Sequence, residues 1–136
     1  MKVFQTKTKR ISGTDYREVY GKSHAAYYAI AGKTKRRPYV RSAYFDKDKV
    51  FLDYFWQHLH QKNWKDRIRR LKLYPCALEL IQHSKAEPIT KQNPNKPSEI
   101  LHRFAGITKD QELFFIQIRE DKKGKQKDFM SVFPAE

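Results

Sequence analysis

The stretch "ILHRFAGITKDQELFFIQIREDKKGKQKDFMSVFPA", from Ile100 to Ala135, decides the fold. It contains three runs rich in β-branched and aromatic residues, separated by the polar segments Thr108–Glu112 and Glu120–Asp128. Runs of this composition bounded by polar turns predict strands, and short turns favour antiparallel pairing of neighbours. The sequence therefore predicts an antiparallel meander of three strands at the end of the chain.

The two faces of this meander differ in chemistry, because successive side chains of a strand point to opposite faces. Phe114, Ile116 and Ile118 share one face and should be buried, and Met130 and Val132 suit the same side. The opposite face would mix aromatic with polar side chains: Leu113, Phe115, Gln117, Arg119, Phe129, Ser131 and Phe133. Such a mixture predicts a surface that stacks bases and binds phosphates. The alternative is a face partly covered by the N-terminal segment.

The elements before the meander are a strand followed by helices. Asn63 and Pro75 are typical of helix starts, and three prolines predict a loop before the meander. In chain order we expect a strand at 39–45, helices at 47–63, 63–71 and 74–84 with Asp46 or Asp48 capping the first, and a loop at 85–99. This order predicts an α+β domain in which an N-terminal strand and helices pack on a small C-terminal antiparallel sheet. Residues 1–37 read as a basic N-terminal arm or extension, and residues 38–136 as the domain.

The charge of the chain indicates the class of partner. Its 136 residues include 29 Lys and Arg against 15 Asp and Glu, which gives a formal net charge of +14. Such an excess repels itself in a small domain, and nucleic acid is the usual partner that neutralises it. A generic basic surface remains the alternative. A membrane partner is disfavoured, because no stretch sets a basic face against a clean apolar face.

Cysteine content and the length of apolar runs further limit the class of protein. Cys76 is the single cysteine, so neither an internal disulfide nor a thiolate zinc cluster can form. No apolar run approaches the roughly 18 residues that span a bilayer, and the first ten residues do not resemble a signal peptide. We therefore expect a cytoplasmic protein without a metal or other cofactor, and a leaderless exported toxin is the alternative.

Two features of the sequence suggest a functional site without reference to any known family. His102 lies in the first strand of the meander, and histidine has the side-chain pKa nearest neutrality, which makes it the best general acid or base. Strand parity leaves open which way it faces, and a structural histidine is the more common alternative for a single strand histidine. The run "KTKRRPYVR", from Lys33 to Arg41, interleaves cations with Tyr39 and predicts a phosphate-binding patch. A solvated charge run is the alternative interpretation.

The segments "RPYVRSAYFD" (37–46), "HRFAGITKD" (102–110) and "FMSVFP" (129–134) resemble the phage-associated barnase–EndoU–colicin–RelE-like nuclease domains. The resemblance covers residues 38–134 and implies a RelE- or barnase-like fold. It also implies a metal-independent endoribonuclease, a toxin of a phage or mobile element, in which the 2′-hydroxyl of RNA attacks the adjacent phosphate. An acidic antitoxin or immunity protein would then be a partner.

The resemblance assigns roles by position. The implied catalytic residues are His102, Arg41, Lys109, Arg119 and Ser131. The implied substrate-binding residues are Arg36, Arg37, Tyr39, Arg103, Thr108 and Gln117. Only one histidine falls in the matching strands, so the identity of the general base stays open. Two alternatives remain: a non-catalytic RNA- or DNA-binding module of the same fold, and an interaction protein of a mobile element.

Overall fold

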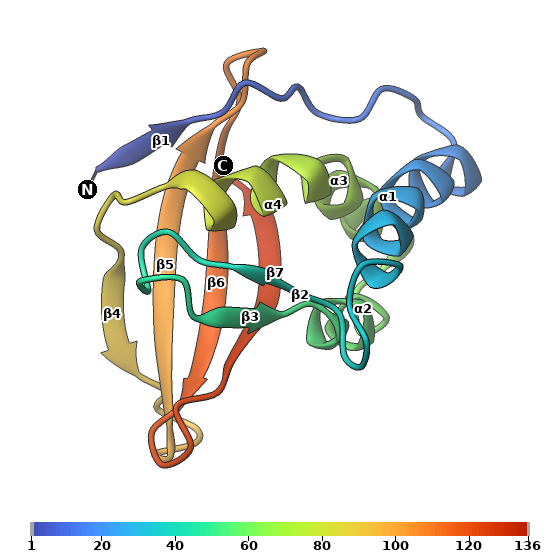
Figure 1. Cartoon of the computed structure of the whole chain (residues 1–136). Helices are drawn as coiled ribbons and strands as arrows, with labels where there is room; N and C mark the ends of the chain where they lie inside the picture. Colours follow the sequence, from blue (N-terminus) through green and yellow to red (C-terminus); the bar gives the residue numbers. More distant parts are fainter. Residues whose placement is uncertain (1, 136) are drawn as a thin grey trace.

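The three C-terminal strands form the centre of the fold. In the computed structural model, which describes residues 2–135, β5 (Glu99–Ile107), β6 (Leu113–Asp121) and β7 (Lys127–Pro134) pair antiparallel in sequence order (Figure 1). The predicted meander is therefore confirmed. The α+β class is also confirmed, because four helices accompany this sheet within the described residues.

The sheet is larger than expected and mixed in direction. β1 (Val3–Gln5), β2 (Tyr39–Arg41), β3 (Lys49–Phe51) and β4 (Ile89–Gln92) extend the meander to seven strands. The order is β1-β5-β6-β7-β3-β2, and β4 also pairs with β5. Two of the pairings, β1 with β5 and β3 with β7, are parallel. The expectation of a small, purely antiparallel sheet was too simple, since strands distant in sequence join both of its sides.

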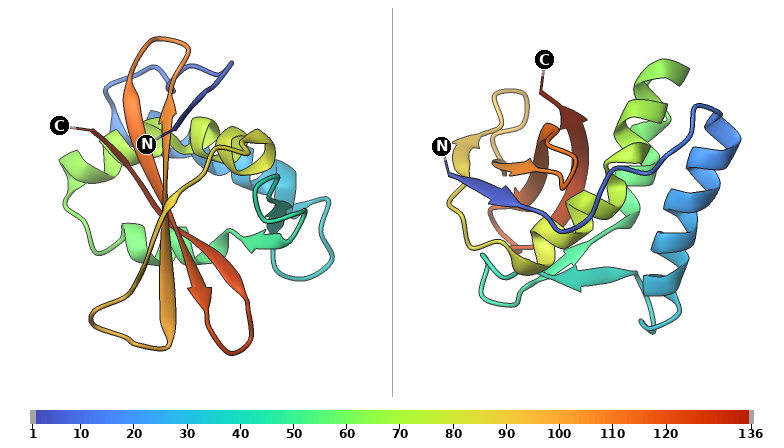
Figure 2. Two further views of the ribbon diagram at one scale, coloured as in Figure 1. Left: turned by 90° about the vertical axis from the view of Figure 1, so that its left-hand side faces the viewer. Right: turned by 90° about the horizontal axis from the view of Figure 1, so that it is seen from above.

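Four helices accompany the sheet, and their buried apolar side chains form one core with its inner face, defined here as the face that buries Ile116 and Ile118. They are α1 (Tyr16–Ala31), α2 (Asp53–Leu59), α3 (Trp64–Lys72) and α4 (Tyr74–His83). α3 and α4 start as predicted: the Asn63 side chain accepts a hydrogen bond from the Asp66 amide, and Pro75 occupies the first turn of α4. α1 is the outermost element on the helical side (Figure 2). No helix of the described part is long and apolar enough to cross a membrane.

Two predicted segments have a different structure. Residues 49–51 form β3 rather than the first turn of a helix, because Val50 is fully buried and β3 pairs with both β2 and β7. Residues 89–92 form the exposed strand β4 inside the predicted loop. In each case pairing with a distant strand outweighs local propensity. The strand predicted at 39–45 ends at Arg41, and a turn with positive φ at Asp46 and Lys47 follows.

A β-bulge changes the side-chain pattern of β7. Ser131 pairs with Gln117 and Phe129 with Ile118, so Met130 is the extra residue between them. A bulge shifts the alternation of faces by one residue. Phe129 is therefore fully buried and stacks on Phe55 with ring centroids 4.9 Å apart, whereas the Met130 sulfur contacts the side-chain amide of Gln117 on the other face. The predicted faces of these two residues were wrong for this reason.

The first 37 residues contribute to the same core where the structure describes them. β1 pairs with β5, and the backbone amides of Lys7 and Thr8 donate to the Glu79 carboxylate on α4 at 2.8 and 3.1 Å. Val19 and Ser23 of α1 are fully buried. The segment predicted as an arm is thus tied to the sheet at one end and to the helices at the other.

Candidate nucleic-acid interface

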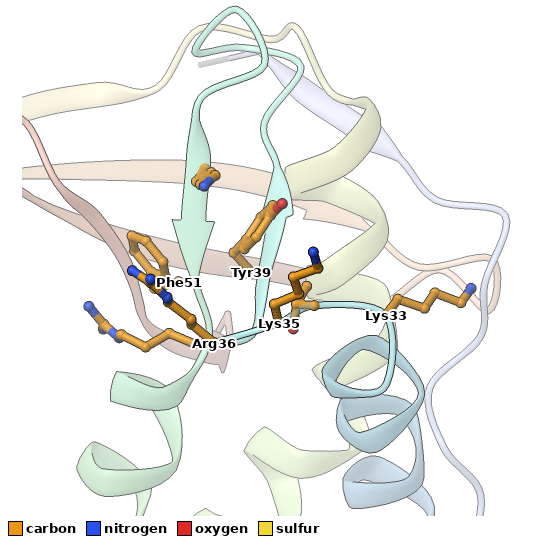
Figure 3. Close-up of a pocket in the computed structure, with 8 residues that line it drawn as sticks. Lys33, Lys35, Arg36, Tyr39 and Phe51 are labelled. Carbon is orange, nitrogen blue, oxygen red and sulfur yellow. The ribbon is translucent and has the colours of Figure 1, made fainter.

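A cavity of about 750 Å³ lies between the loop that follows α1 and the strands β2 and β3. We call it the basic pocket, and its lining residues are Lys33, Thr34, Lys35, Arg36, Arg37, Tyr39, Lys49 and Phe51. Five of these eight side chains are cationic and none is acidic. Figure 3 shows Tyr39 and Phe51 on adjacent strands, with Lys35 and Arg36 extending from the loop that leads into β2.

The aromatic wall of the basic pocket follows from strand alternation. Val40 and Val50 point into the core, where they are 4% and 0% exposed. Their neighbours Tyr39 and Phe51 must therefore point outward, and they form a directly opposed cross-strand pair. The two rings lie 6.1 Å apart between centroids in an edge-to-face arrangement. Short β2 and β3 thus present two half-buried aromatic rings to solvent.

Cations surround both rings. The Arg37 guanidinium lies 4.3 Å from the centroid of Phe51, and the Lys49 ammonium lies 4.7 Å from that of Tyr39. Arg41 lies 5.5 Å from the Tyr39 ring and donates to the Lys47 carbonyl at 2.9 Å. These separations allow attraction between each cation and a ring face. A base stacked here would bring its phosphates among amino and guanidinium groups.

Arg37 is fixed by two carboxylates. Its Nη2 lies 2.8 Å from Asp53 Oδ1 and 3.2 Å from Asp128 Oδ1, and the second oxygen of Asp128 binds Arg119 Nη2 at 3.0 Å. Hydrogen bonding from Arg37 lowers the pKa of Asp53, so this pair stabilises the fold at neutral pH and weakens as pH falls through the lowered pKa. Asp128 is only 2% exposed. The loop of the basic pocket is therefore anchored to the centre of the sheet.

A second cavity of about 380 Å³ adjoins the basic pocket, because Lys49 and Phe51 line both. Its other lining residues are Arg41, Asp48, Lys125 and Gln126. Together the two cavities form what we call the basic groove. A third cavity of about 240 Å³ shares Gln126, but its three carboxylates outnumber its two cations. The positive character thus declines toward the β6–β7 turn, and anionic ligands are favoured in the first two cavities.

His102 lies outside this groove, on the inner face of the sheet. Its Nδ1 is 2.8 Å from the Thr90 hydroxyl and its Nε2 is 2.8 Å from Glu120 Oε1. The Phe45 ring covers it at 4.9 Å, and the residue is 7% exposed. Both ring nitrogens are therefore engaged in bonds that tie β4, β5 and β6 together. A substrate atom could reach this imidazole only if one of those bonds opened.

The remaining predicted residues fall into three places. Arg36, Arg37, Tyr39 and Arg41 meet in the basic groove. Arg103, Gln117, Arg119 and Ser131 lie on the outer face of the sheet, opposite the core. Arg103 is exposed and donates to Gln117 at 3.4 Å, Arg119 binds Glu99 at 3.2 Å and Asp128, and Ser131 is 6% exposed.

Thr108 and Lys109 lie at the β5–β6 turn, away from the other predicted residues. Thr108 is fully buried, and its hydroxyl donates to Asp110 at 2.6 Å and accepts from the Glu112 amide at 2.9 Å. These bonds shape the turn. The Lys109 side chain is exposed, and its backbone amide donates to the Thr8 carbonyl at 3.1 Å.

Sequence reasoning missed Lys49, Phe51 and Asp128 as parts of the site. Lys49 and Phe51 fell in a predicted helix, although "KVF" is the aromatic–valine–cation pattern of "YVR" in β2 read in reverse, as an antiparallel partner would be. That alternation was the available signal for a second short strand. Asp128 was counted as a turn residue, and no local pattern indicates that it would bind two arginines from distant segments.

Comparison of the chain with known proteins found no match. No protein-family model matches the chain. No curated protein and no solved structure matches it either. The groove and the residues that form it are therefore the basis on which we infer the function of this chain.

Proposed function

We propose that the chain binds single-stranded nucleic acid in the basic groove, with RNA as the ligand that the sequence resemblance implies. One observation carries the proposal: two outward-facing aromatic rings, Tyr39 and Phe51, line a cavity with five cations and no carboxylate. Aromatic side chains stack on unpaired bases of any sequence, and cations bind the phosphates that flank them. A duplex keeps its bases stacked internally, so it offers only its phosphates to this site.

Electrostatics support the same ligand. Lys33, Lys35 and Arg36 make no ion pair with a carboxylate of residues 2–135, so their charge is directed to solvent. Each phosphate contact on a single strand contributes a slope of about −0.7 to the dependence of log affinity on log salt. With up to five cations in the basic pocket, we expect a slope between about −3 and −4.

The test compares a fluorescently labelled 12-nucleotide single-stranded RNA with the same strand in a duplex, by fluorescence anisotropy in EDTA. We expect the single strand to bind at least about tenfold more tightly, which corresponds to one stacked base at about 1–3 kcal/mol. Equal affinities for the two forms would contradict the stacking site, and a salt slope near zero would contradict phosphate binding. Single-stranded DNA of the same sequence reports whether the 2′-hydroxyl contributes.

Cleavage of the bound strand is the second candidate function, and Tyr39 is the observation that favours it. Its phenol lies in the basic pocket with Lys49 and Arg41 near its ring. In the proposed reaction the 2′-oxygen attacks phosphorus and loses its proton to a base, and the P–O5′ bond breaks. The products are a 2′,3′-cyclic phosphate and a 5′-hydroxyl that takes up a proton. Cations around the phosphate stabilise the charge that develops on it.

The same binding reactions, resolved on a denaturing gel, test cleavage. If Tyr39 is the acid or base, Tyr39→Phe lowers the rate about 10²- to 10⁴-fold while the affinity stays near that of the wild type. His102→Asn should remain active, since His102 is sealed by Thr90 and Glu120. Loss of cleavage in a folded His102→Asn variant would instead identify the imidazole as the catalytic group. Absence of any cleavage with intact binding would leave the binding function alone.

The proposal also includes a protein partner and a cellular location. An acidic antitoxin or immunity protein would compete with RNA for the basic groove, because carboxylates can replace phosphates beside Lys33, Lys35 and Arg36. Cellular RNA as the substrate implies a cytoplasmic site of action.

A further inference from the structure

The outer face of the sheet continues from the basic groove to a second pair of aromatic rings. Directly paired residues of neighbouring strands share a face of the sheet. Phe51 pairs with Asp128, and Asp128 pairs with Arg119, so all three lie on the outer face. Alternation along β6 then places Gln117 and Phe115 on this face, and Phe115 pairs with Phe133. We call this set the outer strip: Phe51, Asp128, Arg119, Gln117, Phe115 and Phe133.

The far end of the outer strip also combines aromatic rings with cations, and it differs from the basic pocket in that Asp66 lines it and pairs with Arg70 at 3.3 Å. The Phe115 and Phe133 rings are half-buried, with centroids 5.7 Å apart. Arg103 lies 5.3 Å and Arg70 5.7 Å from the centroid of Phe133. An open cavity of about 220 Å³ adjoins the two rings and is also lined by Asp66, Arg69, Arg70, Pro134 and Ala135. Ring faces beside guanidinium groups can hold a stacked base together with its phosphate.

We infer that Phe115 and Phe133 form a second base-stacking subsite for the same strand that enters the basic groove. The inference rests on the proposed function and deepens it, because it defines the ligand class by length. Asp128 and Phe133 pair with Arg119 and Phe115, which are four residues apart on β6, because Met130 is the extra residue of the bulge. The path is therefore about 14 Å at about 3.4 Å per residue. That path corresponds to about four stacked nucleotides at about 3.4 Å each. A strand must therefore have about five nucleotides or more to reach both subsites.

Aromatic rings at both ends of the outer strip favour a nucleic-acid strand over an acidic peptide. A peptide carboxylate needs only the cations, whereas Tyr39 with Phe51 and Phe115 with Phe133 offer ring faces for bases. Between the two ends, Arg119 is engaged with Glu99 and Asp128, and its guanidinium lies 4.0 Å from the Tyr54 ring. The Gln117 side chain is engaged with Arg103 and Met130. The middle of the strip therefore contributes less affinity than its ends.

The experiment measures the affinity of single-stranded RNAs of 3 and 9 nucleotides, without self-complementarity, for the full chain at about 0.1 M salt. The wild type should bind the 9-mer far more tightly than the 3-mer. Phe133→Leu, which keeps an apolar side chain and removes the ring, should weaken 9-mer binding about 5- to 100-fold and change 3-mer binding less than about twofold. Arg103→Gln, at an exposed position, should weaken the 9-mer alone by about fivefold. Tyr28→Leu, an exposed ring on α1 away from the strip, is the matched control and should change neither.

Each other outcome overturns the inference. Wild-type affinities that do not rise from 3 to 9 nucleotides would mean that a second subsite is absent. A 9-mer affinity unchanged in both Phe133→Leu and Arg103→Gln would exclude these residues from the second subsite. Because Arg103 is exposed, its variant still gives an interpretable affinity if the Phe133 variant folds poorly. Failure of the wild type to bind either RNA would refute the proposed function itself, a result distinct from loss of the length effect.

Discussion

Replacing Lys33, Lys35, Arg36 and Lys49 with glutamine is expected to lower the affinity for single-stranded RNA roughly 10²- to 10³-fold at about 0.1 M salt. All four side chains line the basic pocket, and each phosphate contact on a single strand contributes about 0.7 of a log unit per decade of salt. Four contacts therefore account for about three log units between 0.1 and 1 M salt. The same variant should show a salt slope shallower by about 3, measured by anisotropy titrations at several salt concentrations.

A matched control variant separates the contribution of the basic pocket to RNA affinity from the contribution of net charge. Glutamine at Lys2, Lys85, Lys91 and Lys123 removes the same number of charges from exposed positions that do not line the groove. Both variants lower the formal charge from +14 to +10, by four charges. The control should lose less than about fivefold in affinity, because distant surface charges are screened beyond about 10 Å at this salt. Equal losses in the two variants would mean that the basic surface acts without a defined site.

Asp128→Ala is expected to lower the free energy of unfolding by about 3 kcal/mol, the lower end of the cost of breaking a buried ion pair. Asp128 is 2% exposed and joins Arg37 of the pocket loop to Arg119 of β6, with further bonds from Gln126 at 3.3 Å. The cost falls at the lower end because Arg37 keeps Asp53 and Arg119 keeps Glu99. Urea unfolding followed by tryptophan fluorescence measures the difference.

Asp128→Asn is the control for volume, since it keeps the shape and one hydrogen-bonding oxygen but removes the charge. It should cost less than the alanine variant, and the difference reports the hydrogen bonds that survive. RNA affinity should fall in both variants, because Arg37 loses its link to the sheet and the pocket loop is less fixed. An alanine variant within about 1 kcal/mol of the wild type would show that this network is not an anchor.

The sequence predicted those parts of the fold that depend on local pattern. Three closing strands, a capping Asn63 and Pro75 in a first helical turn all appear where alternation and helix-start signals indicated them. The parts that failed depend on distant pairing: β3 needs β7, and β4 needs β5. The bulge at Met130 also has no local signal, and it reverses the faces expected for Phe129 and Met130.

The candidate site, like the fold, was predictable only where a local sequence pattern indicates it. The basic run before β2 predicted half of the groove, because cations interleaved with Tyr39 are visible in the sequence. The usual pKa range of histidine and the family resemblance both indicate His102, and no local pattern reveals that Thr90 and Glu120 engage both of its nitrogens. Its role as a catalytic residue stays a prediction. Arg37 was predicted to bind substrate, yet two carboxylates brought by α2 and β7 give it an anchoring role as well.

Photo-cross-linking tests most directly whether nucleic acid lies in the basic groove. A 9-nucleotide single-stranded RNA containing 5-iodouridine, which couples to aromatic side chains in contact with the base, is irradiated with the wild-type chain, and the linked peptides are sequenced by mass spectrometry. We predict links to Tyr39 or Phe51, which disappear when Lys33, Lys35, Arg36 and Lys49 are replaced. Links confined to aromatic residues outside the groove and the outer strip, unchanged in that variant, would contradict the account.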